Sequence, residues 1–573
     1  FRTRNPIIFY SNHPDFQQTN TISGLIGTGT GGVTESLKNR VIMPIAPSLA
    51  QTDHTLGHEL VHAFQYNMFI REDSSRRMSI NNIPLWMVEG MAEYLSIGSL
   101  DPNTSMWMRD ALLNKRFPTL QQLSDQSEYF PYRYGQAFWA MVGKTWGDTV
   151  IIPLFEKTAQ YGFNKAVDSL FKINDKTLSG MWKSATEVYY KQYMKDSVDS
   201  PAGKVLVSDK NGGRVNISPS VSPDGRYVAF FSERDLFTLD LFLAEVSSGK
   251  IIKRLSSVAR NSAADDFDYV ESAGTWSPDG KKYAFVIFRK GANKLAVVDV
   301  AKGKITKELD IPGVASFSNP AWSPGGDEIA VSGLVEGIGD LYLFNIYTGE
   351  VRRLTGDNEA NLLPSWSPDG NYIVFSQEKA NPPGGKRKYS YNLSIYDLKK
   401  GSSTEIDIFQ GAYNMNPHFS ADGRSVYFLS DADGFRNLYR YDTETKRVFR
   451  LTHYITGISG ITPYSPALSV SLKNDLIVYN YYFNNRYQII AADKTDFTED
   501  ERDGNYLNFE AGTLPPYDHV SANIVDRNLY DKRIVADISP DQAVKIPYKS
   551  KFRLDYISNS ANIGLSTGMY RNN

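Results

Sequence analysis

Residues 366–370 read WSPDG, and near-copies of this pentapeptide recur along the second half of the 573-residue chain. SPDG also occurs at 222–225 and 277–280, with the variants SPGG at 323–326 and SADG at 420–423 and a degraded copy, SLKN, at 471–474. Proline fixes φ, aspartate accepts hydrogen bonds from the turn backbone, and glycine supplies a positive φ. Each copy therefore predicts a tight turn between two strands.

The copies are regularly spaced, 55, 46, 44, 53 and 51 residues apart. An aromatic or apolar residue precedes each turn, an alternating segment such as NYIVFSQ (371–377) follows it, and two further strand-like segments complete the copy. About fifty residues and four strands is the size of a β-propeller blade. Six copies therefore predict a six-bladed propeller over residues 205–495, and KVLVSD (204–209) is available as the outer strand that closes the ring.

The repeats resemble the TolB-like propeller family, whose blades carry this W-S-P-D-G signature. The resemblance covers about half of the chain and rests on a motif that recurs. It implies a protein partner at a face of the propeller. Since such propellers are commonly modules of the cell envelope, it also implies export to the periplasm, outer membrane or cell surface of a bacterium.

The first part of the chain has a different pattern. Leucine, valine, methionine and aromatic residues recur with helical spacing in 48–69, 84–97 and 134–146, where Ser48 and Pro84 suit helix starts. Before them, RVIMP (40–44) is typical of a short strand. The polar segment 195–204 has the composition of a linker. These features predict a mainly helical domain over residues 1–198, followed by the all-β region.

Three of the seven histidines lie within nine positions of the first predicted helix: His54, His58 and His62. His58 and His62 are four residues apart, so their rings lie on one helix face. With Glu59 they form H-E-x-x-H, the zinc-peptidase motif, in which the glutamate takes a proton from the water that Zn²⁺ activates. A catalytic zinc needs a third protein ligand. A helix that exposes histidines to solvent is the alternative, and it is the preferred interpretation of His54.

A second helical segment, WMVEGMAEY (86–94), places two acids four residues apart. Glu89 can coordinate zinc. Glu93, one turn later, can accept a hydrogen bond from a ligand histidine and fix its tautomer. Two acids on a solvated face are the alternative, but the bulky apolar residues of this segment leave it little other polar surface.

HELVH followed by W-x-x-E-G-x-A-E-Y resembles the gluzincin metallopeptidases, most closely the peptidase MA-like group. The resemblance implies a thermolysin-like α+β zincin domain. It also implies that His58, His62 and Glu89 bind Zn²⁺, that Glu59 is the general base, and that Glu93 is the acid behind the ligands.

The chain departs from the family at points that bear on substrate choice. Val88 stands where the aminopeptidases have asparagine, and G-x-M-E-N, which grips a free N-terminus, does not occur. Endopeptidase action on a peptide or protein substrate is therefore expected. An oxyanion-stabilising donor is usual in such sites. Tyr132 and Tyr134 are available, Tyr134 is the catalytic candidate, and core packing is the alternative. The RVIMP strand is expected to pair with an extended substrate.

Composition excludes other classes of function. Sixty-two basic and 64 acidic residues give a net charge of -2, which argues against nucleic-acid binding. Cysteine is absent, so disulfides and thiolate metal sites are excluded. No apolar run reaches the roughly 18 residues of a transmembrane helix. The chain opens FRTRNPIIF, without methionine or a signal-peptide core, and is expected to be a processed or trimmed product.

Residues 505–573 do not continue the repeat. Their end, KFRLDYISNSANIGLSTGMY (551–570), alternates like a β-hairpin and faintly resembles the start of an outer-membrane β-barrel. This tail predicts an association with the outer membrane.

Two functions of different classes follow. The first is a zinc-dependent endopeptidase whose propeller binds substrates or partners. The alternative is a cell-envelope scaffold that acts through its propeller, with an inactive or occluded peptidase domain. Glu59 favours the enzyme, because a scaffold that had lost its chemistry could have lost this base as well.

Overall fold

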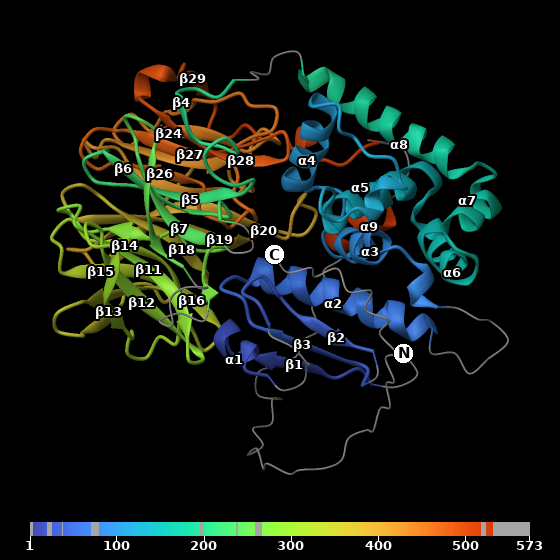
Figure 1. Ribbon diagram of the computed structural model, residues 1–573, viewed down its shortest axis with the longest axis horizontal. Coiled ribbons are helices and arrows are strands. Elements are labelled where there is room, and N and C mark those ends of the chain that lie inside the picture. The colour runs from blue at the N-terminus through green and yellow to red at the C-terminus, as the bar shows by residue number, and fades with distance from the viewer. Residues whose placement is uncertain are drawn as a thin grey trace, which may run out of the picture. The chain divides into compact units, whose positions relative to one another are not determined.

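The helical segments and the strand repeats form two architectures in the computed structural model (Figure 1). The structure describes residues 4–19, 26–36, 38–69, 79–194, 200–235, 239–257, 266–516 and 523–530. All of them belong to one compact unit, Phe1–Lys532. The hairpin predicted for 551–570 lies outside the described residues. None of the described helices has the length and apolar character needed to cross a bilayer.

A three-stranded sheet opens the chain, in the order β1-β3-β2. Its strands are β1 (Ile7–Tyr10), β2 (Val33–Glu35) and β3 (Arg40–Pro44). β3 pairs parallel with β1 and antiparallel with β2. The RVIMP strand is therefore present, but the expectation that it pairs with a substrate was wrong, because both of its edges are occupied. β2 is an edge strand instead.

Most of the helices follow the sheet in the chain. The described α-helices are α1 (His13–Gln17), α2 (Leu49–Phe69), α3 (Leu85–Ile97), α4 (Pro102–Leu113), α5 (Pro131–Trp146), α6 (Ile151–Tyr161), α7 (Phe163–Phe171), α8 (Asp175–Tyr190) and α9 (Ile524–Tyr530). The three predicted ones, α2, α3 and α5, start close to their expected positions. α2 begins after Ser48 and α3 after Pro84. α5 begins three residues earlier than predicted, because proline is well suited to the first helical position.

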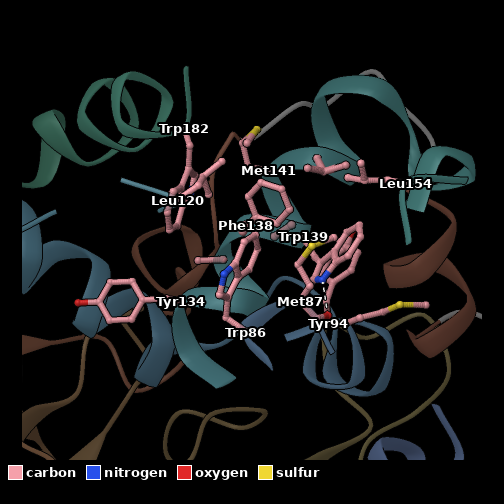
Figure 2. Packing of buried hydrophobic residues seen from close by; sticks show 14 of the residues in the cluster. Trp86, Met87, Tyr94, Leu120, Tyr134, Phe138, Trp139, Met141, Leu154 and Trp182 are labelled. Carbon is pink, nitrogen blue, oxygen red and sulfur yellow. Dashed lines mark hydrogen bonds between the residues drawn. The ribbon is translucent and has the colours of Figure 1, made fainter. Parts of the chain in front are cut away.

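The helical core forms where α3 and α5 cross at a pair of glycines. A Cβ on Gly135 would lie 2.0 Å from the carbonyl oxygen of Trp86, and one on Gly90 would lie 2.2 Å from the backbone of Gly135. The two helix backbones are therefore in contact. Figure 2 shows the large side chains that surround this crossing, among them Trp139, whose Nε1 donates to the carbonyl of Met87 at 2.9 Å.

Six sheets, each an antiparallel meander, make up the strand region among the described residues. Their strands are β5 (Asn216–Val221), β6 (Tyr227–Ser232), β7 (Asp240–Glu245), β8 (Ile251–Ser256); β9 (Asp266–Phe267), β10 (Thr275–Trp276), β11 (Lys282–Arg289), β12 (Ala292–Asp299), β13 (Lys304–Leu309); β14 (Ser316–Trp322), β15 (Glu328–Val335), β16 (Ile338–Asn345), β17 (Val351–Arg353); β18 (Asn361–Trp366), β19 (Tyr372–Ala380), β20 (Tyr389–Asp397), β21 (Ser402–Ile406); β22 (Asn414–Phe419), β23 (Ser425–Ser430), β24 (Asn437–Asp442), β25 (Val448–Arg450), β29 (Asp500–Arg502); and β26 (Leu468–Val470), β27 (Ile477–Phe483), β28 (Arg486–Ala492), β4 (Lys204–Val207).

The sheets close into a ring of six blades. Their innermost strands contact one another in a cycle, from β5 through β10, β14, β18, β22 and β26 back to β5. β4 pairs antiparallel with β28 as the outer strand of the last blade. The predicted role of KVLVSD is thereby confirmed: residues that precede the first blade complete the last one.

The recurrent motif has two structural roles. In its turn, Ser367 Oγ donates to the Asp369 carboxylate at 2.6 Å, and Gly370 has φ of +71°. Its tryptophan joins neighbouring blades, because Trp366 Nε1 donates at 2.9 Å to the carbonyl of Ala321 in the preceding blade. The motif therefore shapes a hairpin and also holds adjacent blades together.

After β29 the chain returns to the helical region. The backbone N–H of Leu514 donates to the carbonyl of Ser99 at 2.8 Å, and the Ser99 N–H donates to the Asp526 carboxylate at 2.9 Å. Leu514 and Val525 are members of the helical core. The described part of the tail predicted at 505–573 is therefore packed on both regions: Leu514 and Val525 join the helical core, and Phe509 joins a cluster of the strand region.

Candidate metal and catalytic site

Two adjacent helices carry the predicted site. α2 presents His58, Glu59 and His62, and α3 presents Glu89 and Glu93. The helices approach closely beside Gly57, where a Cβ would lie 3.1 Å from the Cβ of Ser96. The HExxH segment and the WMVEGMAEY segment therefore face each other, as a shared site requires.

Three potential ligand atoms converge between these helices. The Nε2 atoms of His58 and His62 are 3.0 Å apart, and each lies 3.3 Å from Oε2 of Glu89. A tetrahedral zinc ion with bonds of about 2.0–2.1 Å sets its ligand atoms about 3.3 Å apart. The spacing of these three atoms therefore fits a zinc ion.

The outer nitrogens of both histidines are hydrogen-bonded to oxygen atoms. His58 Nδ1 lies 3.0 Å from Oε1 of Glu93, and His62 Nδ1 lies 2.8 Å from Oε1 of Gln65. The Gln65 amide is itself oriented, because its Nε2 donates to the carbonyl of Val88 at 2.9 Å. Both Nδ1 atoms are thus the protonated ones, and in a neutral ring each Nε2 presents a lone pair.

This arrangement brings two nitrogen lone pairs and a carboxylate oxygen to one point. Such a set is repulsive without a cation, and Glu89 Oε2 is buried without a hydrogen-bond partner. Without a cation, this repulsion is removed only if one of the three groups takes up an additional proton. Burial lowers the pKa of His58, but Glu89 and Glu93 raise it to about 10, while the histidines hold the pKa of the Glu89 carboxyl down at about 2 against the effect of burial. The donor set fits Zn²⁺.

Glu59 is buried beside the ligands, on the side of the small sheet. Its Oε2 accepts a hydrogen bond of 2.6 Å from Oγ1 of Thr34, on edge strand β2. Gly32 packs against its side chain, since a Cβ there would lie 2.8 Å from Cγ of Glu59. The carboxylate is thereby held in one orientation next to the histidines.

The structure separates the two tyrosines at the start of α5. Tyr134 is buried in the helical core, where its ring contacts Trp107 and Tyr129. Tyr132 instead stacks on the His58 ring, with centroids 5.7 Å apart and planes 16° apart. Burial and the Glu89 carboxylate raise the pKa of Tyr132, so its hydroxyl keeps its proton and can donate. Of the two tyrosines, Tyr132 contacts His58, whereas the catalytic candidate Tyr134 packs against other aromatic rings.

His54 also differs from its preferred interpretation as a solvated residue. Its Nε2 lies 3.2 Å from Oε1 of Glu93, the same oxygen that contacts His58. Burial raises the pKa of Glu93, but the two histidines hold it well below its usual range. His54 thus belongs to the group that fixes His58.

The site opens onto a cavity of about 670 Å³. Helical-region residues on its wall include His58, Glu59 and Tyr132, and strand-region residues include Asp268 and Phe317. A ligand in this cavity would contact both parts of the chain.

Two site residues were not found from the sequence. Gln65 lies three positions after His62, a spacing that places both on one face of a helix, so the sequence did contain a signal for it. Thr34 lies on a strand twenty-five positions before Glu59, and no local pattern links the two residues.

Comparison with known proteins identifies the kind of fold to which the strand region is similar. Residues 268–385 match a family model described as the TolB beta propeller domain. The strand region holds a TolB-like β-propeller. The match begins after the helical region, so it does not include the histidine site.

Curated relatives share only part of this chain. The uncharacterized protein Atu1656 of Agrobacterium fabrum is 28% identical over 38% of this chain and 67% of its own length. The uncharacterized peptidase YuxL of Bacillus subtilis is 26% identical over 30% of this chain and 31% of its own length. The Tol-Pal system protein TolB of Francisella tularensis is 29% identical over 28% of this chain and 34% of its own length. The chain thus spans about a third of the length of the last two. A solved structure, TolB from Acinetobacter baumannii, has a TM-score of 0.34 at 18% identity, covering 56% of this chain and 71% of that one.

Proposed function

We propose that this protein is a zinc-dependent endopeptidase with a thermolysin-like, gluzincin-type site. The observation that carries the proposal is the convergence of His58 Nε2, His62 Nε2 and Glu89 Oε2 within 3.0–3.3 Å, with both Nδ1 atoms already engaged. Helices with solvated histidines would not bury two imidazole nitrogens and a carboxylate oxygen against one another. A bound cation would accept lone pairs from all three.

The residues have distinct tasks in this mechanism. When bound by His58, His62 and Glu89, zinc would supply Lewis-acid chemistry, lowering the pKa of a water and polarising a peptide carbonyl. Glu59 is held beside the ligands by Thr34 and is the base that accepts the proton of the attacking water. It then delivers that proton to the leaving amine.

The surroundings supply substrate contacts. The Tyr132 hydroxyl is the donor for the oxygen of the peptide carbonyl, since it lies in the cavity wall and keeps its proton. Among the described residues, β2 is an edge strand of the small sheet and lies beside Glu59, which suits it to pair with an extended peptide. The relative YuxL is named a peptidase. That name supports a hydrolase function and specifies no metal.

The test combines metal content with a variant of the base. We expect close to one zinc per chain, and we expect Glu59→Gln to retain the zinc while hydrolysis of a quenched peptide library falls about 10²–10⁴-fold, as for the loss of a general base. Glu187→Gln, an exposed glutamate of α8, is the matched control and should leave turnover unchanged. Unchanged turnover in Glu59→Gln, or no uptake of zinc on titration, would contradict the proposal.

The alternative function is a scaffold of the cell envelope that binds a protein through the propeller. The match of residues 268–385 and the TolB relative favour it, and an exported, envelope location is proposed on the same grounds. A zinc-loaded protein that cleaves no peptide of the library would favour the scaffold. Peptide hydrolysis by the wild type that is lost in Glu59→Gln would favour the enzyme.

A further inference from the structure

The helix that carries the histidines begins against the propeller. Glu378, on β19, accepts hydrogen bonds from the backbone N–H groups of Leu49 (2.9 Å, to Oε2) and Ala50 (2.7 Å, to Oε1), the first two residues of α2. The first N–H groups of a helix have no acceptor within the helix, and a negative charge there is favourable. One carboxylate of the propeller thus caps the metal-binding helix with both of its oxygens.

Glu378 is itself rigidly held. Its side chain is buried, and Tyr391 Oη lies within hydrogen-bond distance of both Glu378 Oε1 (3.2 Å) and Ser48 Oγ (2.9 Å). Burial raises the pKa of Glu378, and the hydrogen bonds from α2 and Tyr391 counter that effect. The cap is therefore a preformed feature of the fourth blade.

Two further contacts dock the same end of α2. Gln51 Nε2 donates to Glu271 Oε1 at 2.6 Å, and Lys388 Nζ lies 2.9 Å from Oδ2 of Asp53. These contacts reach the second and fourth blades. The start of α2 is thus fixed to the propeller, while α3, which carries Glu89, is held by the helical core.

The metal ligands come from these two separately anchored helices. His58 lies nine residues, or about 14 Å, along α2 from Leu49 at 1.5 Å per residue. A helix transmits an axial shift along its whole length, and a metal site tolerates displacements of only about 0.5 Å. The position of α2 relative to α3 therefore determines whether the three ligand atoms are close enough to bind one ion.

We propose that Glu378 is a positioning residue for the metal site: by capping α2 from the propeller, it fixes His58 and His62 against Glu89. The propeller is then part of the catalytic unit and not only a binding module. The proposal rests on the proposed zinc function of the same site.

The experiment uses the full chain, with Glu378→Gln as the variant and Glu405→Gln as the matched control. Glu405 is an exposed carboxylate in the same blade that pairs with Lys379. Glutamine keeps one acceptor oxygen but loses the charge and the second oxygen. We expect Glu378→Gln to weaken zinc affinity about tenfold or more, measured by competition with a chelator, to change the visible spectrum of the cobalt-substituted protein, and to lower kcat with little change in KM. Glu405→Gln should match the wild type in all three.

The outcomes separate positioning from simple stability. A lower Tm with unchanged zinc affinity and an unchanged cobalt spectrum would overturn the proposal, because Glu378 would then be only structural. If Glu378→Gln does not fold, Tyr391→Phe decides: it keeps both amide hydrogen bonds but removes the hydroxyl that orients the carboxylate, and it should weaken zinc binding about two- to fivefold. Wild-type affinity in Tyr391→Phe would then overturn the proposal. Failure of the wild type itself to bind zinc would instead refute the proposed function.

Discussion

The side-chain amide of Gln65 determines which nitrogen of His62 faces Glu89. Its Oε1 accepts from Nδ1 at 2.8 Å, and its Nε2 is committed to the carbonyl of Val88, so the amide cannot turn without losing a buried hydrogen bond. The tautomer that presents Nε2 to Glu89 is thereby fixed by the chain itself.

Replacing Gln65 with leucine should therefore weaken zinc binding. Leu has a similar size but cannot accept the Nδ1 proton, so we expect the zinc dissociation constant to rise about 10–100-fold, the usual effect of losing a partner behind a ligand. Chelator competition measures this constant. Gln192→Leu, on the surface of the helical region, is the control and should not change it. Equal affinities in the two variants would contradict the role given to Gln65.

At this scale the sequence predicted which histidines and acids lie close together, but not which tyrosine faces them. The spacing of HExxH and of the two acids on the next segment follows from helix geometry, which is local. Tyr132 and Tyr134 are only two positions apart, and a helix directs such residues to opposite sides. Which one faces the histidines depends on how α5 is rotated against α3, and that rotation is set by tertiary packing.

The crossing of α3 and α5 depends on Gly90 and Gly135. Neither position has room for a methyl group, since a Cβ would lie within 2.2 Å of the partner backbone. Gly90 is also next to the proposed ligand Glu89. Close packing of the two helices and the placing of a ligand thus depend on one residue.

Gly90→Ala should destabilise the protein, although alanine favours helices. Separating the backbones disturbs the core, at a cost of about 3 kcal/mol or more in the free energy of unfolding. Gly180→Ala, in α8, is the control, because nothing lies within 4 Å of its added Cβ, and it should stabilise by about 0.5–1 kcal/mol. Chemical denaturation measures both. Similar shifts in the same direction would contradict the close-contact argument.

At the scale of elements, periodicity and turn chemistry predicted α2, α3, α5 and the six blades, but not which elements lie side by side. The segments of α2, α3 and the SPDG turns each contain their own signal. The order β1-β3-β2 contains none, which is why RVIMP was expected at an edge and lies in the middle. Strand order is decided by contacts between segments that are distant in the chain.

The ring is held closed by β4, which comes from before the first blade. Leu206 of this strand is buried in the seam, whereas its neighbour Val205 is 43% exposed. We expect Leu206→Asp to lower the free energy of unfolding by about 3–5 kcal/mol, because it buries an unpaired carboxylate where the ring closes.

Val205→Asp is the matched control for this prediction, since it places the same charge on the solvent side of the same strand. Chemical denaturation of the two full-length variants makes the comparison. A small effect of Leu206→Asp, similar to that of Val205→Asp, would show that the ring does not depend on this closing strand.

The return of the chain after the propeller has a consequence for synthesis on the ribosome. The helices up to α8 are made first, but their core lacks Leu514 and Val525 until the whole propeller has followed. At roughly 5–20 residues per second, some 300 further residues take about 15–60 s to emerge. During that interval the apolar face that these residues later cover is open. A nascent chain halted within the propeller would therefore be a natural client for chaperones that recognise exposed apolar surface.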